Sequence, residues 1–157
     1  MTTQLDRKPT VIPRWIVRTI WAMHRLAYSV TRGRFGLREN VPGHWGMLRL
    51  TTVGRRTGHK RVAILGYLED GPNLVTPAMN GWAQPDPAWW LNLQANPEAT
   101  VELSSGARRV IARGASPEER VRLWANFVAL GSSAFSDAAA AQRSRPTALA
   151  VFEPKAG

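Results

Sequence analysis

The feature that most constrains the fold is a series of short strand-like segments separated by tight turns. Residues 47–53 and 61–68 flank a loop with two glycines at 54–58, and residues 74–78 return after a turn cluster at 69–73. Connections this short join antiparallel neighbours, because a parallel pair needs a crossover of about a dozen residues or more. The pattern therefore predicts a closed antiparallel sheet rather than a parallel sheet with crossover helices.

Further segments complete this architecture. Residues 99–103 and 108–112 flank the turn Ser104-Ser105-Gly106 and predict a second hairpin, and residues 147–153 predict a final strand. Ser116-Pro117-Glu118-Glu119 begins a helix, because Ser at the cap and Glu three residues later match a capping box. We expect one domain over 1–157, with a tail and helix at 1–35 and a barrel core at 45–154.

A short helix expected over residues 85–96 carries the adjacent tryptophans Trp89 and Trp90. Neighbouring side chains on a helix point in different directions, so we expect only one ring in the core. The other would line the pocket of a planar ligand. The alternative, that both rings wedge between helix and barrel, stays open.

The formal net charge of +10 is concentrated in the first part of the chain. Residues 1–62 hold 13 Lys and Arg against 2 Asp and Glu, whereas the remaining 95 residues hold 8 against 9. An anionic partner is therefore expected to meet the first part. Nucleic acid is disfavoured as that partner, because no recognition helix or aromatic-interleaved strand motif accompanies the charge.

Residues 13–30 predict an amphipathic helix that is too often interrupted by arginine to span a bilayer. Its arginines recur at spacings of 4, 7 and 7 and so share one stripe: Arg14, Arg18, Arg25 and Arg32. Trp15 and Trp21 lie at the borders of the apolar face. Two alternatives stay open: the helix lies in an anionic membrane surface, or it packs on its own domain. The expected location is the cytoplasm, peripheral to the inner face of the cell membrane under the first alternative.

Side chains that perform catalysis by themselves are scarce. His24, His44 and His59 are far apart and share no motif with a carboxylate, so no metal site is expected. The chain has no nucleophile elbow, Walker loop or dinucleotide loop, and its lack of cysteine excludes disulfides and thiol nucleophiles. We assign no catalytic residue, and we expect redox chemistry to belong to a bound cofactor.

The most informative cluster is the loop from Gly54 to Arg61. It gathers four cations and a hydroxyl between two strands: Arg55, Arg56, Thr57, Lys60 and Arg61. Such a loop collects donors around a phosphate or carboxylates. An exposed basic turn without a ligand is the open alternative.

The order of these motifs resembles the deazaflavin (F420)-dependent nitroreductase family. The resemblance rests on LTTVGRRTG at 50–58, then Arg61, Asn80-Gly81 and PAWWLNLQANP at 87–97. Members of that family are split β-barrel oxidoreductases that use reduced coenzyme F420. The implied fold is α+β: an FMN-binding-like split β-barrel of about six to seven mainly antiparallel strands, with an N-terminal amphipathic helix and short flanking helices.

The resemblance also implies which residues bind the cofactor. Those expected to hold its phosphate and glutamyl tail are Arg55, Arg56, Thr57, Lys60 and Arg61. Those expected to line the deazaflavin ring are Val62, Ala63, Ile64, Leu65, Pro77, Ala78, Met79, Asn80, Ala88, Trp89, Trp90, Leu91 and Asn92.

The chain departs from the nitroreductases after Trp124, where the tyrosines that shape their substrate pocket are missing. The substrate pocket expected instead contains Trp82, Ser132, Ser133 and Phe135 and suits a more apolar acceptor. The expected function is F420H2-dependent hydride transfer to an electron-poor acceptor such as a quinone, an enone or a nitro compound. The alternative is a non-catalytic split-barrel module that carries F420 or another flavin or haem.

Overall fold

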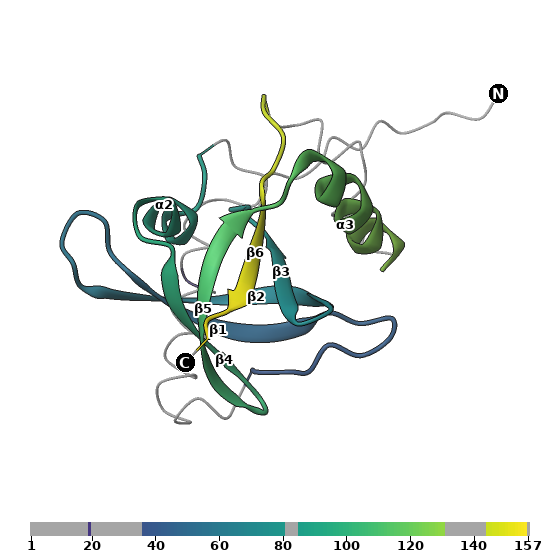
Figure 1. The fold of residues 1–157 in the computed structure, drawn as a ribbon, viewed down its shortest axis with the longest axis horizontal. Coiled ribbons are helices and arrows are strands. Elements are labelled where there is room, and N and C mark those ends of the chain that lie inside the picture. Colours follow the sequence, from purple (N-terminus) through teal and green to yellow (C-terminus); the bar gives the residue numbers. More distant parts are fainter. Residues whose placement is uncertain (1–18, 20–35, 81–84, 131–143, 157) are drawn as a thin grey trace. The chain divides into compact units, whose positions relative to one another are not determined.

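The computed structural model describes residues 19, 36–80, 85–130 and 144–156 (Figure 1). The chain divides into two units, Met1–Gly36 and Leu37–Gly157, and the second contains all the elements described below. Several predictions lie outside the described residues: the N-terminal helix apart from Thr19, and the pocket residues Trp82, Ser132, Ser133 and Phe135.

Among the described residues, six antiparallel strands form a closed barrel, as the sequence predicts (Figure 1). The strands are β1 (Gly46–Val53), β2 (Lys60–Asp70), β3 (Asn73–Pro77), β4 (Glu98–Leu103), β5 (Gly106–Gly114) and β6 (Leu149–Pro154). Their order around the barrel is β1-β2-β3-β6-β5-β4, and β4 pairs with β1 to close it. Closure leaves no unpaired edge in this sheet.

Strict alternation along the strands fills the barrel interior. Leu48 and Leu50 of β1 are fully buried and lie opposite Leu65 and Ala63 of β2, so these four side chains share the inner face. Val101 of β4 pairs with Leu50 and continues this face. The register is thereby fixed, because a slip by one residue would turn the apolar set outward.

Helix α2 (Ala88–Ala95) places both of its tryptophans in this core. Trp89 and Trp90 are 7% and 6% exposed, and their ring centroids lie 6.2 Å apart in an edge-to-face arrangement. The expectation that only one ring enters the core is therefore wrong, and the wedge alternative is right. The physical reason is that α2 contacts β1, β2 and β5, so the helix has apolar neighbours on more than one side.

Helix α3 (Pro117–Ala129) packs on the outside of the barrel. Its buried residues Leu123 and Phe127 join a cluster with Leu68, Val75 and Val151, which alternate with inward-facing neighbours on their strands. No helix in the described part of the chain is long and apolar enough to cross a bilayer.

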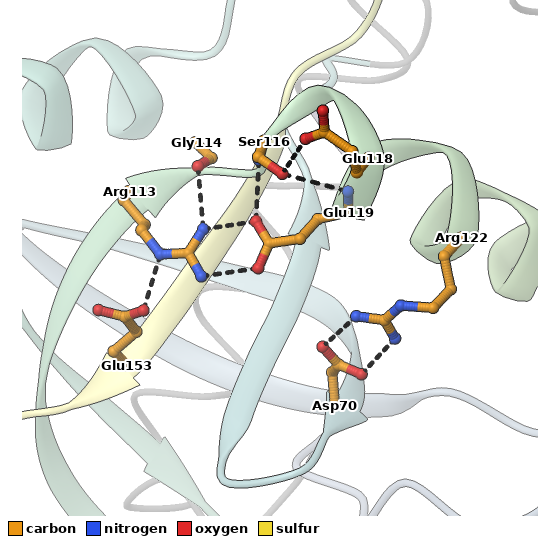
Figure 2. A network of polar contacts seen from close by, with 8 residues as sticks. All are labelled: Asp70, Arg113, Gly114, Ser116, Glu118, Glu119, Arg122 and Glu153. Atoms are coloured by element: carbon orange, nitrogen blue, oxygen red, sulfur yellow. Dashed lines mark hydrogen bonds and ion pairs between the residues drawn. The ribbon is translucent and has the colours of Figure 1, made fainter.

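A polar network holds the start of α3 against the barrel (Figure 2). Arg113 of β5 donates two hydrogen bonds to the Glu119 carboxylate, at 2.7 and 2.9 Å, and a third at 2.7 Å to Glu153 of β6. The predicted capping box is confirmed: the Ser116 backbone N–H donates to Glu119 at 2.8 Å, and its hydroxyl accepts from the Glu119 backbone N–H at 3.2 Å. These bonds lower the pKa of Glu119 to about 2, chiefly through Arg113.

We predict that Glu119→Gln destabilises the protein by about 1–2 kcal/mol at pH 7, because it removes a carboxylate that serves as both cap and ion-pair partner. The folded-state pKa lies below the ordinary value, so the carboxylate stabilises the fold fully above pH ~5. That contribution is lost as pH falls through about 2. Urea unfolding of both proteins at pH 7 and at pH 2–3 measures the difference, which should narrow at the lower pH. Glu118→Gln is the control, since Glu118 is exposed and accepts only from the Ser116 hydroxyl at 3.0 Å, a bond that a glutamine oxygen can also accept. An equal loss there would contradict the assignment.

Candidate functional site

A buried amide connects the basic loop to the barrel and to α2. Asn92 of α2 is 3% exposed, and its Oδ1 accepts hydrogen bonds from the backbone N–H and the Nη1 of Arg55, at 3.1 and 3.2 Å. Its Nδ2 donates to Thr52 Oγ1 of β1 at 3.3 Å. The structure thus brings together Arg55 and Asn92, two residues that the sequence predicts for one site.

The loop itself is a tight turn closed by backbone hydrogen bonds. The Gly54 N–H donates to the His59 carbonyl and the Gly58 N–H donates to the Gly54 carbonyl, both at 2.8 Å. Gly58 has φ of 70°, which favours glycine, and a Cβ on Gly54 would lie 3.1 Å from the His59 carbonyl oxygen. Thr57 Oγ1 accepts from Arg61 Nη2 at 3.5 Å, so its hydroxyl helps to order the loop.

The cations of this loop are exposed and have no carboxylate partner among the described residues. The bonds of Arg55 and Arg61 go to the neutral oxygens of Asn92 and Thr57. Five arginines elsewhere in the described chain do pair with acids: Arg49, Arg109, Arg113, Arg122 and Arg145. Uncompensated, clustered cations on an anchored loop fit the phosphate and carboxylates of a polyanionic tail.

The residues predicted to line a planar ring differ in solvent exposure and in the face of the strand on which they lie. Ala63 and Leu65 are half-buried and face the barrel interior, whereas Val62, on the other face of β2, is 41% exposed. Ile64 also alternates away from that interior and is buried.

In the other two ring-lining segments, accessibility falls into three classes. The exposed residues are Asn80 and Ala88, and the half-buried ones are Met79 and Leu91. Those buried are Pro77, Ala78, Trp89, Trp90 and Asn92. Ala78 belongs to the same core cluster as both tryptophans.

Sequence reasoning missed Thr52. The residue is 2% exposed, and its hydroxyl accepts from Asn92 and donates to the Arg61 carbonyl at 3.5 Å. A signal was available, since Thr52 occupies an inward position of β1 directly before the basic loop. A buried hydroxyl at such a position needs a hydrogen-bond partner from a neighbouring element.

Comparison with known proteins identifies the family. Residues 22–154 match the family model described as F420H(2)-dependent quinone reductase. The chain belongs to this family.

Individual relatives agree with the match to the F420H(2)-dependent quinone reductases. Two Mycobacterium tuberculosis proteins with that name, Rv1261c and MT1299, are 35% identical over 121 residues, which is 72% of this chain and 78% of theirs. A solved structure titled F420-H2 dependent reductase (FDR-A) has a TM-score of 0.61 and 24% identity, covering 68% of this chain and 93% of that one. Its likeness supports the split-barrel fold.

The family assignment confirms several predictions from sequence. The chain is an F420-dependent split-barrel oxidoreductase, and its cofactor is the reduced form of F420. The family description names quinones as acceptors, one of the three predicted acceptor classes.

We predict that Asn92→Leu uncouples the basic loop from α2. Leucine has the same branching as asparagine, although it is larger, and leaves the Thr52 hydroxyl and the Arg55 backbone N–H without the Asn92 amide, so unfolding free energy should fall by about 1–3 kcal/mol. F420 affinity should fall severalfold, as measured by fluorescence titration. Gln94→Leu on the same helix is the control, because Gln94 is exposed. Unchanged stability and affinity in Asn92→Leu would contradict the prediction.

Proposed function

We propose that this protein catalyses hydride transfer from reduced F420 to a quinone. The observation that carries the proposal is the set of exposed loop cations that have no carboxylate partner among the described residues, anchored by Asn92, in a chain of the F420H(2)-dependent quinone reductase family. The same cluster would be electrostatically unfavourable as a bare turn, because four like charges lie within seven residues.

In this proposal the basic loop binds the tail of the cofactor and segments 62–65, 77–80 and 88–92 bind its ring. Arg55, Arg56, Lys60 and Arg61 supply charged donors, and Thr57 orders them through Arg61. Bound reduced F420 supplies the hydride, and the chain's own residues bind, orient and exclude water. This division of labour explains why the sequence contains no acid–base set of its own.

We further propose that the acceptor is an apolar quinone rather than a nitroimidazole. The segment after Trp124 lacks tyrosine, and Phe135 is the one aromatic residue between positions 131 and 143. Together with Trp82, Ser132 and Ser133, it forms the acceptor pocket in this proposal. Relatives named as quinone reductases support the acceptor class.

The direct test follows the deazaflavin absorbance of reduced F420 with purified protein and menadione. Arg56→Ala should weaken F420 binding about tenfold or more, since a charged hydrogen bond contributes about 1.5–3 kcal/mol. The difference in F420 affinity between wild type and Arg56→Ala should become smaller at high salt, because salt screens an exposed charged contact. Arg109→Ala is the matched control: Arg109 is also exposed but pairs with Glu98 at 3.1 Å on β4.

Two results would count against the proposal. Tight binding of reduced F420 without its oxidation above background would favour a cofactor carrier. Binding of FMN without binding of F420 would overturn the cofactor assignment.

We also propose that residues 13–32 attach this cytoplasmic enzyme to an anionic membrane surface, where lipid-soluble quinones reside. The support is the arginine stripe with bordering Trp15 and Trp21. Four arginines near such a surface contribute on the order of 1 kcal/mol each.

We predict that vesicles containing anionic lipid sediment the full chain and release it in high salt. Neutral vesicles are the control, and a chain beginning at Gly36 should stay in the supernatant. Equal sedimentation of the two chains with anionic vesicles would refute the membrane role of the N-terminal segment.

A further inference from the structure

Arg120 is a half-buried arginine that no ion pair explains. It lies in the first turn of α3, where its Nη1 donates to the Thr147 backbone carbonyl. Its guanidinium lies over the Trp124 ring, 5.3 Å from the centroid. Burial alone lowers the pKa of Arg120, and the guanidinium remains a cation at any physiological pH.

Arg120 and Arg108 are the two half-buried arginines of the described chain without a carboxylate partner, and of the two only Arg120 is oriented by a carbonyl and an aromatic ring. Among the half-buried arginines that the structure describes, Arg49 pairs with Glu102 and Arg113 pairs with Glu119 and Glu153. Within the described chain, Arg120 has only a neutral carbonyl and an aromatic face. Partial burial of a cation without an acid costs free energy, and at Arg120 the Thr147 carbonyl and the Trp124 ring fix the orientation of that cation.

The position of Arg120 suggests what that role is. Thr147 directly precedes Ala148, whose carbonyl accepts a hydrogen bond from the Ala78 N–H at 2.8 Å. Met79 packs against the same apolar cluster as Trp124. Through Thr147 the guanidinium is bound one residue from the Ala148 carbonyl that holds segment 77–80, one wall of the proposed deazaflavin site.

We propose that Arg120 binds the carbonyl oxygen of the quinone and stabilises the negative charge that forms on it. This inference rests on the proposed quinone reductase function. A quinone that accepts a hydride gains two electrons, and the negative charge comes to rest on its oxygen. One proton from water then completes the hydroquinone, and the proton left on the oxidised cofactor returns to water.

The geometry of Arg120 suits this task. A guanidinium has five N–H donors, and here one is given to Thr147 while one face is covered by Trp124. No other described residue accepts from the remaining N–H groups, which leaves them for a ligand oxygen. Held on two sides, the cation is oriented before the charge develops, which is the condition for strong electrostatic stabilisation.

The test compares two hydride acceptors, one that becomes negatively charged on reduction and one that becomes neutral. Menadione develops a negative charge on reduction, whereas the N-methylphenazinium cation loses its charge. Steady-state rates with reduced F420 are measured for wild type, Arg120→Gln and Arg120→Lys. Arg120→Gln should lower kcat/KM for menadione by about 10- to 100-fold and for the phenazinium by less than about threefold. Arg120→Lys should recover part of the menadione activity.

Arg108→Gln is the matched control. Arg108 is also half-buried, with a buried Nε that has no hydrogen-bond partner, but it lies opposite Val101. Arg108 lies six residues before Gly114, the last residue of β5, and six residues of strand span about 20 Å. This variant should leave the ratio of the two acceptors unchanged. Dissociation constants for F420 should stay within about twofold in all variants, because none of them alters the basic loop.

The possible outcomes separate the two proposals. An equal loss with both acceptors in Arg120→Gln, or no loss with either, would overturn the role of Arg120 while the quinone reductase function stands. A wild-type protein that does not oxidise reduced F420 with menadione would overturn the proposed function and this inference with it.

Discussion

The buried amide of Asn92 is the interaction on which the site depends. One side chain satisfies a hydroxyl of the barrel wall, Thr52, and two donors of the basic loop, both from Arg55. Because an amide has both donor and acceptor ends, it connects groups that neither a carboxylate nor an ammonium could satisfy together. Burial strengthens these bonds and makes their loss expensive. The loop that carries the cofactor-binding charge is therefore fixed by a neutral group, which leaves that charge intact.

The arginines of the described chain divide by what surrounds them. One group pairs with acids, as Arg113 does with Glu119 and Glu153, so its charge is balanced within the protein. Those of the loop, together with Arg38, Arg108 and Arg120, have no acid partner among the described residues. Ion pairs such as those of Arg113 fix the geometry of the elements that they join. Absence of pairing keeps electrostatic potential available for an anionic ligand.

Sequence patterns predicted the barrel well because alternation and short turns leave few other topologies. Strand boundaries differ by a few residues, as in the final strand, which begins at Leu149 rather than 147. Predicting the environment of α2 was harder. Helical direction alone places Trp89 and Trp90 on different sides, but only the folded barrel shows that apolar neighbours surround both. The Thr52–Asn92 bond joins residues 40 apart in sequence, and Arg120 meets Thr147 27 residues away. Local periodicity carries no information about such contacts.

The capping box of Ser116 and Glu119 lies in the same first turn of α3 as Arg120. Glu119 is fixed by Arg113 and by Ser116, and Arg120 is the next residue along the chain. A guanidinium on a frayed helix start would sample many positions, and its interaction with a forming oxyanion would be reduced by the cost of ordering it. Because the pKa of Glu119 is about 2, its ion pair with Arg113 persists throughout the physiological pH range. The stability of the helix start thus serves to hold Arg120 in place at the pH at which the enzyme works.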